Sequence, residues 1–205
     1  MDQKGHSDRD EFEQGFMERL SAWRVLEAKV AANAEADLDA IATPILDRLS
    51  RLEWPRETNI SLDLDPSGET LMLDVDLPEI EDFPDQRLEV DRTALNVKQV
   101  RLPITQVREA YARHVHGILL RLVAESFAAH GAIMAIEVSG YTQRQSEPGL
   151  EPVSEYILSC RISRTAWDHA RLWQGNIVDP VAALGQFEPR RKYNGKGKLM
   201  SIKPH

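Results

Sequence analysis

Residues 105–127 read TQVREAYARHVHGILLRLVAESF, and this stretch decides the fold. Its apolar residues recur at steps of three and four, which is typical of a helix that packs one wide face against a core. The stripe consists of Val107, Tyr111, Val115, Ile118, Leu119, Leu122 and Val123. Thr105 is a suitable N-cap, and Gly117 inside the stripe favours close approach of another backbone. The spacing therefore predicts one long helix that lies across a sheet.

The segments on both sides of this helix have a period of two, which is typical of strands. Before it, residues 60–64 and 71–77 alternate around the turn sequence DPSG at 65–68, which predicts a β-hairpin. After it, residues 132–141 and 155–163 are rich in β-formers and predict two more strands. We expect residues 79–91, which are acidic and contain proline, to be a surface connector. Short helices are expected to begin near Thr165, with Asp168 completing a capping box, and after Asp179–Pro180.

The N-terminal part has helical periodicity at residues 8–30 and again at residues 38–52, which predicts a helical pair. Pro44 is expected to start or kink the second helix. The anchors of the first helix, which we expect to be buried against residues 38–52 or against a second copy or partner, are Phe12, Phe16, Trp23 and Leu26. The predicted fold class is α+β: this N-terminal helical pair, followed by a mainly antiparallel sheet crossed by one long helix. We expect a helical arm at residues 1–55, an α+β core module at 56–188 and a basic C-terminal tail at 189–205.

The composition indicates a globular protein of 205 residues, with 42% hydrophobic and 28% charged residues. Its one cysteine, Cys160, lies in an apolar run and indicates a reducing compartment. The N-terminus is polar and acidic, unlike a secretory signal. The longest nearly apolar run, residues 131–136, is far shorter than the ~20 residues of a membrane-spanning helix. We therefore expect a cytoplasmic protein with no membrane partner.

The charge is divided unequally between the two halves of the chain. Residues 1–100 contain 24 acidic and 11 basic residues, whereas residues 101–205 contain 9 and 14. The most basic stretch is RRKYNGKGK at 190–198, which contributes Arg190, Arg191, Lys192, Lys196 and Lys198. Cations with an interleaved tyrosine and glycines are typical of phosphate-backbone contacts. The alternatives are a solvated terminus or an arm that docks on the protein's own acidic face.

Five stretches of the chain look familiar together: residues 74–84, 111–118, 138–144, 156–161 and 187–191. They resemble the C-terminal region of a group of uncharacterised bacterial proteins, some of which carry a short Gly/Ser-rich β domain at the N-terminus. The likeness covers residues 57–205, and the helical pair in front departs from that arrangement. The resemblance implies a bacterial cytosolic module and lends no activity.

One set of polar residues suggests an enzyme. A glutamate on a helix beside carboxylates on strands is the layout of restriction-endonuclease-like, metal-dependent nucleases. Here that layout gives Glu125, Glu137 and Glu155, with Arg161 where a catalytic lysine would stand. Arg161 can stabilise charge but cannot act as a base, and the nuclease motif itself is missing. The alternatives are a degenerate relative of that fold, or an ordinary ion pair between Arg121 and Glu125.

Three aspartates on the polar face of the first predicted hairpin are a second candidate. Asp74 and Asp76 point the same way, about 7 Å apart, a spacing that suits a shared divalent cation. Counting through the turn places Asp63 nearer Thr70 than Asp74, which favours a solvated acidic face instead. His114 and His116 are two apart on a helix and point to different sides, so they cannot chelate one ion together. No cofactor is expected, apart from Mg²⁺ under the nuclease hypothesis.

The function that these patterns favour is a non-catalytic bacterial interaction module. In it the helical arm mediates self-association or partner binding, and the basic C-terminal half contacts an anionic partner such as nucleic acid. A metal-dependent nuclease, possibly degenerate, is one alternative. The other is an acidic protein that mimics nucleic acid, which the acidic first half would suit.

Overall fold

The computed structural model describes residues 21, 24, 37–54, 58–91, 96–144, 153–172 and 178–205. The chain divides into two compact units, Met1–Ala42 and Thr43–His205. In the first unit the described residues are all helical. The predicted partner-binding residues Phe12, Phe16, Trp23 and Leu26 lie outside the described part of the chain. The division falls inside the arm expected at residues 1–55. Residues 37–50 are helical without a break through Pro44, so no helix begins at that proline.

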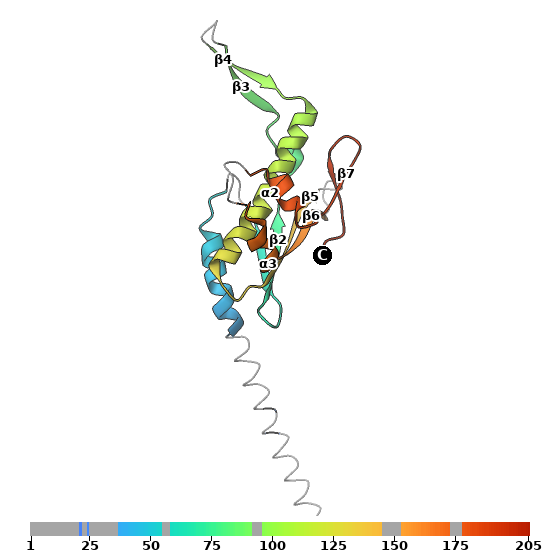
Figure 1. Ribbon diagram of the computed structural model, residues 1–205. Coiled ribbons are helices and arrows are strands. Elements are labelled where there is room, and N and C mark those ends of the chain that lie inside the picture. Colours follow the sequence, from blue (N-terminus) through green and yellow to red (C-terminus); the bar gives the residue numbers. More distant parts are fainter. Residues whose placement is uncertain are drawn as a thin grey trace, which may run out of the picture. The chain divides into compact units, whose positions relative to one another are not determined.

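A six-stranded sheet is the centre of the second unit (Figure 1). Its order is β1 (Ile60–Leu64), β2 (Thr70–Asp76), β5 (Ala135–Arg144), β6 (Val153–Ser163), β7 (Arg190–Tyr193) and β8 (Leu199–Met200). Neighbouring strands are antiparallel except β2 and β5, which are parallel. The first hairpin is therefore present as predicted, and so are the two strands that follow the long helix. The α+β class with a mainly antiparallel sheet is confirmed.

Helix α2 (Ile104–Ala129) makes the crossover between the parallel strands β2 and β5. Its apolar stripe is buried, as are Leu71 and Leu73 of β2 and Ile136 and Val138 of β5. These side chains form the core on one face of the sheet. The N-cap is Pro103 rather than the predicted Thr105, and no side chain caps the helix. Proline fixes φ near −65° and so directs the chain into the first turn by itself.

A second, two-stranded sheet consists of β3 (Gln86–Asp91) and β4 (Asn96–Arg101), which form a hairpin that projects from the N-terminal end of α2 (Figure 1). The prediction that residues 79–91 are only a connector is therefore wrong. This segment contains a short 3₁₀ helix, Ile80–Asp82, and then β3. Leu88 and Val90 alternate with charged residues over only a few positions. The partner strand β4 contains no strong β-formers other than valine, so the sequence signal for this hairpin is weak.

Two short helices follow β6. Helix α3 (Arg164–Ala170) begins near Thr165 as predicted, but its N-cap is Ser163 rather than Thr165. The Ser163 Oγ accepts a hydrogen bond from the Ala166 N–H at 3.2 Å. Helix α4 (Pro180–Gly185) begins as predicted, with Asp179 as N-cap and proline in the first turn.

The last residues of the chain form structure rather than a separate tail. Strand β7 pairs with β6 and with β8, so residues 190–193 and 199–200 extend the six-stranded sheet. The turn between β7 and β8 is closed by the Asn194 side chain, which accepts hydrogen bonds from the Lys196 and Lys198 backbone N–H groups. Gly197 has a φ of 76°, which glycine adopts without steric cost.

In the described residues no helix has the length and apolarity to cross a membrane.

Candidate functional site

The three glutamates of the nuclease hypothesis lie apart. Glu125 is on α2, where its carboxylate accepts a hydrogen bond from Arg48 at 2.6 Å. Glu137 is on β5, where alternation with the buried Ile136 and Val138 directs it to the face of the sheet that α2 does not cover.

The remaining two members of that set lie along the β5–β6 ladder. Arg161 is the cross-strand partner of Glu137 and binds it at 2.6 Å. Glu155 pairs in register with Thr142, about 17 Å along the ladder from Glu137. In the part of the chain that the structure describes, no three His, Cys, Asp or Glu side chains are placed to bind one metal ion. The structure therefore offers this set no common cation position.

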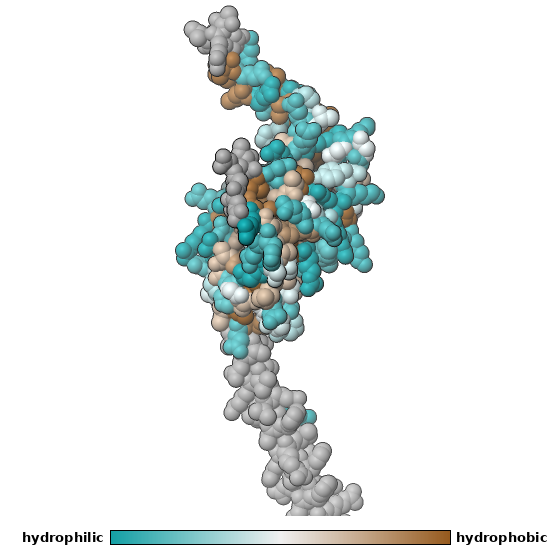
Figure 2. Space-filling view, viewed as in Figure 1, coloured by the Kyte–Doolittle hydropathy of each residue, from teal (hydrophilic) through white to brown (hydrophobic). Residues whose placement is uncertain are grey.

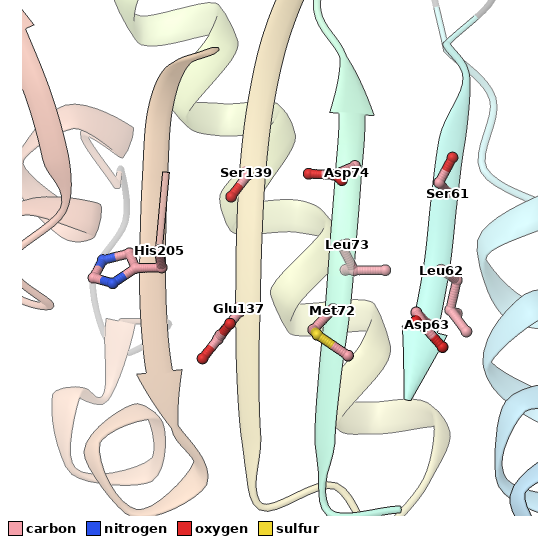
Figure 3. Close-up of a pocket in the computed structure, with 9 residues that line it drawn as sticks. All are labelled: Ser61, Leu62, Asp63, Met72, Leu73, Asp74, Glu137, Ser139 and His205. Atoms are coloured by element: carbon pink, nitrogen blue, oxygen red, sulfur yellow. The ribbon is translucent and has the colours of Figure 1, made fainter. Parts of the chain in front are cut away.

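The uncovered face of the sheet carries polar side chains in rows that the strand register defines. One row is Asp63, Met72, Glu137 and Arg161, and the next is Ser61, Asp74, Ser139 and Ser159. Asp63 therefore lies opposite Met72. It is one row away from both Thr70 and Asp74, so the prediction that it lies nearer Thr70 is wrong. In Figure 3, Asp74 on β2 points toward Ser139 on β5.

These rows border a shallow hollow of about 230 Å³ (Figure 3). Its acidic lining residues are Asp63, Asp74 and Glu137, and His205 lies at its side. The His205 backbone N–H donates to Ser159 Oγ at 3.1 Å. Partial burial, with the nearby Arg190 guanidinium as a smaller cause, lowers the pKa of His205. Arg161 already binds Glu137, so Asp63 and Asp74 supply most of the negative charge of this hollow.

A pair of tyrosines lies at one end of the same face. The rings of Tyr141 and Tyr156 meet edge to face with centroids 5.7 Å apart. Burial is the largest cause that raises the pKa of both phenols; the Asp76 and Asp74 carboxylates add to it at Tyr141, and Asp74 adds to it at Tyr156. Both phenols therefore stay protonated at neutral pH. The pair supports the sheet as neutral, partly buried aromatic surface.

The five predicted nucleic-acid contacts have different environments. Arg191 faces the core and binds His116 and the Val181 carbonyl, at 2.8 and 3.1 Å. Lys198 binds Glu81 at 3.2 Å. Arg190 donates to the Pro204 carbonyl, whereas Lys192 and Lys196 are exposed. Since β7 alternates, Arg190 and Lys192 lie on the face of the sheet that α2 does not cover.

The β3–β4 hairpin has one charged and one apolar face. Val90 lies opposite Val97, and Leu88 lies beside them on the same face. These side chains are 69%, 61% and 69% exposed in that order. Figure 2 shows hydrophobic (brown) surface on this projecting part of the molecule. The opposite face carries Arg87 and Glu89, which form an ion pair.

The exposed apolar face of this hairpin was not predicted from the sequence. The signal was the alternation in residues 87–90, where charged and aliphatic residues take turns. Comparison with protein-family models, with curated proteins and with solved structures gave no match to this chain.

Proposed function

We propose that this chain is a non-catalytic interaction module, and that its β3–β4 hairpin binds the same hairpin of a second copy. The observation that carries the proposal is the exposure of Leu88, Val90 and Val97 on one face of a projecting ribbon. Large aliphatic side chains gathered on one exposed face are typical of protein-binding surfaces. A two-stranded hairpin is also marginal in water, so covering its apolar face stabilises it.

A second copy is the occupant that this surface suits. A flat ribbon with a Val90–Val97 pair at its centre is complementary to itself, because two such faces can stack as two sheets do, about 10 Å apart. The flanking residues on this face are Gln86, Gln99 and Arg101, so each copy has a polar rim with little charge. The strongly charged pair Arg87–Glu89 stays on the outside of the stack.

The size of the surface sets the expected affinity. Stable complexes bury about 800 Å² on each partner, and three aliphatic side chains provide much less. We therefore expect a weak, reversible dimer, with a dissociation constant of the order of tens to hundreds of micromolar. Each chain has a formal charge of -8, so added salt should strengthen the dimer by screening the repulsion between copies.

Sedimentation equilibrium of the full chain between about 5 and 500 µM tests this proposal. The expected result is a mass that rises toward the dimer with concentration, and rises further from 20 to 200 mM salt. The variant with Leu88, Val90 and Val97 all replaced by Thr keeps strand propensity and should be monomeric. The matched control, Lys98→Gln on the charged face, should associate like the natural chain. A monomer throughout this range would overturn the proposal.

An anionic partner such as nucleic acid is the second candidate, and the exposure of Lys192 and Lys196 beside Arg190 favours it. Arg191 faces the core and Lys198 is ion-paired with Glu81. Arg190 binds the neutral Pro204 carbonyl and is exposed, so with Lys192 and Lys196 it leaves about three cations for phosphate contacts. The affinity for duplex DNA should then fall with a log–log salt slope no steeper than about -3. Lys192→Gln with Lys196→Gln should abolish binding, and Lys29→Gln is the control. No binding at 20 mM salt would exclude this candidate.

We also propose a bacterial cytoplasmic setting for this interaction module, in which Cys160 is reduced.

A further inference from the structure

The outer edge of β1 is the feature from which we draw a further inference. Within the described residues β1 is the last strand on its side of the six-stranded sheet. The Asp76 N–H donates to the Asn59 carbonyl, and the Asp65 N–H donates to the Thr70 carbonyl. In an antiparallel pair the hydrogen-bonding residues alternate, so Ser61 and Asp63 also direct their backbone groups toward β2.

The residues between them direct their backbone groups away from the sheet. Those residues are Ile60, Leu62 and Leu64. The Leu64 N–H is already bound by Asp63 Oδ1 at 2.8 Å, which closes that end of the edge. The outward groups of Ile60 and Leu62 have no partner among the described residues, and they offer a short ladder to an incoming strand.

The two faces beside β1 differ sharply in chemistry. On the core side lies an apolar hollow of about 240 Å³, between β1 and residues 46–54, which include the end of the preceding helix. Its apolar lining residues are Leu46, Leu49, Leu52, Trp54, Ile60 and Leu62. On the uncovered side lies the acidic hollow with Asp63 and Asp74 (Figure 3). Strand β1 therefore has an apolar hollow on one face and an acidic hollow on the other.

We propose that β1 binds an extended peptide segment in which apolar side chains alternate with cationic ones, by adding it to the sheet as an edge strand. The side chains of an added strand point alternately to the two faces. One set would enter the apolar hollow beside Leu62, and the other would lie next to Asp63 and Asp74. Backbone hydrogen bonds give such a complex affinity, and the two hollows give it specificity.

A peptide of alternating valine and lysine, blocked at both ends and carrying a fluorophore, tests the proposal by fluorescence anisotropy with the full chain. Two further peptides are compared with it: one with the same residues in two blocks, and one with glutamate in place of lysine. We expect the alternating peptide to bind at least about tenfold more tightly than either. Equal binding of the alternating and block peptides would overturn the proposal, because it would indicate attraction of charge alone.

Two substitutions separate the backbone from the charge. Leu62→Pro removes an outward N–H and leaves the ladder to β2 intact, so it should abolish binding, whereas Leu62→Val should retain it. Asp63→Asn keeps the acceptor for the Leu64 N–H and removes the charge, so it should weaken the valine–lysine peptide several-fold.

Folding and independence are checked in the same experiment. Circular dichroism establishes that each variant is folded. If Leu62→Pro does not fold, amide shifts of Ile60 and Leu62 in the natural chain on peptide addition give the answer instead. Unchanged amides there would also overturn the proposal. The hairpin variant with three threonines should bind the peptide like the natural chain. Peptide binding at β1 and dimerisation through the β3–β4 hairpin are therefore tested independently.

Discussion

Arg191 Nη1 lies 2.8 Å from Nε2 of His116, and Nδ1 of the same ring lies 2.7 Å from the Ala112 carbonyl oxygen. A guanidinium can only donate, so Nε2 accepts and the proton is on Nδ1. The ring is fully buried and is therefore neutral. This contact joins β7 to α2 and explains why a cation of the basic stretch faces the core.

The stability of the protein should depend on pH through His116. Burial is the largest cause that lowers its pKa from 6.5 to about 4, and the nearby Arg191 charge is a smaller cause of the same shift. Between these two values the unfolded chain binds a proton that the folded chain does not. Stability is therefore fully present above pH 6.5 and is lost as the pH falls toward 4, by about 3 kcal/mol. Urea denaturation at half-unit steps of pH measures this loss.

A variant and a direct titration complete that test. His116→Gln keeps a donor and an acceptor without a titrating group, so its stability should vary less between pH 6.5 and 4 than that of the natural chain. The imidazole of His116, followed by NMR, should titrate below pH 5. An ordinary pKa near 6.5 would contradict the prediction.

Gly140 should not tolerate a methyl group. A Cβ built there would lie 2.4 Å from Leu77 Cδ1 and 3.0 Å from Leu77 Cγ. We expect Gly140→Ala to cost about 1–3 kcal/mol, since the core must shift to accept it. In a Leu77→Ala background the same substitution should cost much less, because the methyl group then fills vacated space. Gly131→Ala, with nothing within 4 Å, is the control and should change stability by less than about 0.5 kcal/mol.

Arg164 connects the end of α2 to the sheet. Its guanidinium donates to the carbonyl oxygens of Ile133, His130 and Phe127 at 2.6, 2.7 and 3.2 Å, and it lies over the Phe127 ring. Arg164→Met should cost about 2–4 kcal/mol, because it leaves these carbonyls without their donor. Arg164→Lys should recover only part, since an ammonium cannot reach all three.

The control for Arg164 is the exposed ion pair of Arg161 with Glu137. Arg161→Gln should cost less than about 1 kcal/mol in the same chemical denaturation series. Equal losses at the two arginines would show that the carbonyl contacts of Arg164 contribute little.

Cys160 should report global unfolding. Its side chain is fully buried, and burial raises the pKa of the thiol to about 12. The thiolate is the reactive form, so Ellman's reagent at pH 8 should label the native chain very slowly. In 6 M guanidinium one equivalent should react at once, because the chain has a single cysteine. Rapid labelling of the native chain would place Cys160 in a segment that opens locally.

The elements with strong periodicity were predictable, and those with weak periodicity were not. The stripe of α2 and the alternation around residues 65–68 depend on local spacing, which the sequence displays directly. The β3–β4 hairpin was missed because its alternation spans few residues within acidic, proline-containing chain. The sequence predicts a basic tail where β7 lies, because a short run of cations gives no sign of pairing with β6.

The candidate surfaces depend on pairing register and tertiary contacts, which a single sequence does not encode visibly. Nothing in the order of residues tells that Arg191 faces His116 while Arg190 faces the other way. Likewise, Glu125 and Glu137 stand 12 positions apart, and only the sheet shows that they lie on different sides of it. The unequal charge of the two halves can be read from the sequence. Which cations are exposed depends on the pairing of β7, whose alternation turns Arg191 to the core and leaves Arg190 and Lys192 exposed.

The parallel pairing of β2 with β5 also affects how the chain reaches its native state. Thr70 lies next to Ala135 in this ladder, so the centre of the sheet joins segments far apart in sequence, whereas the β1–β2 and β5–β6 ladders join neighbours. Closing a long loop costs entropy before its contacts form, so such ladders form slowly. During synthesis the β1–β2 hairpin is made before β5, so the edge of β2 that pairs with β5 stays unpaired until the β5–β6 hairpin has been synthesised.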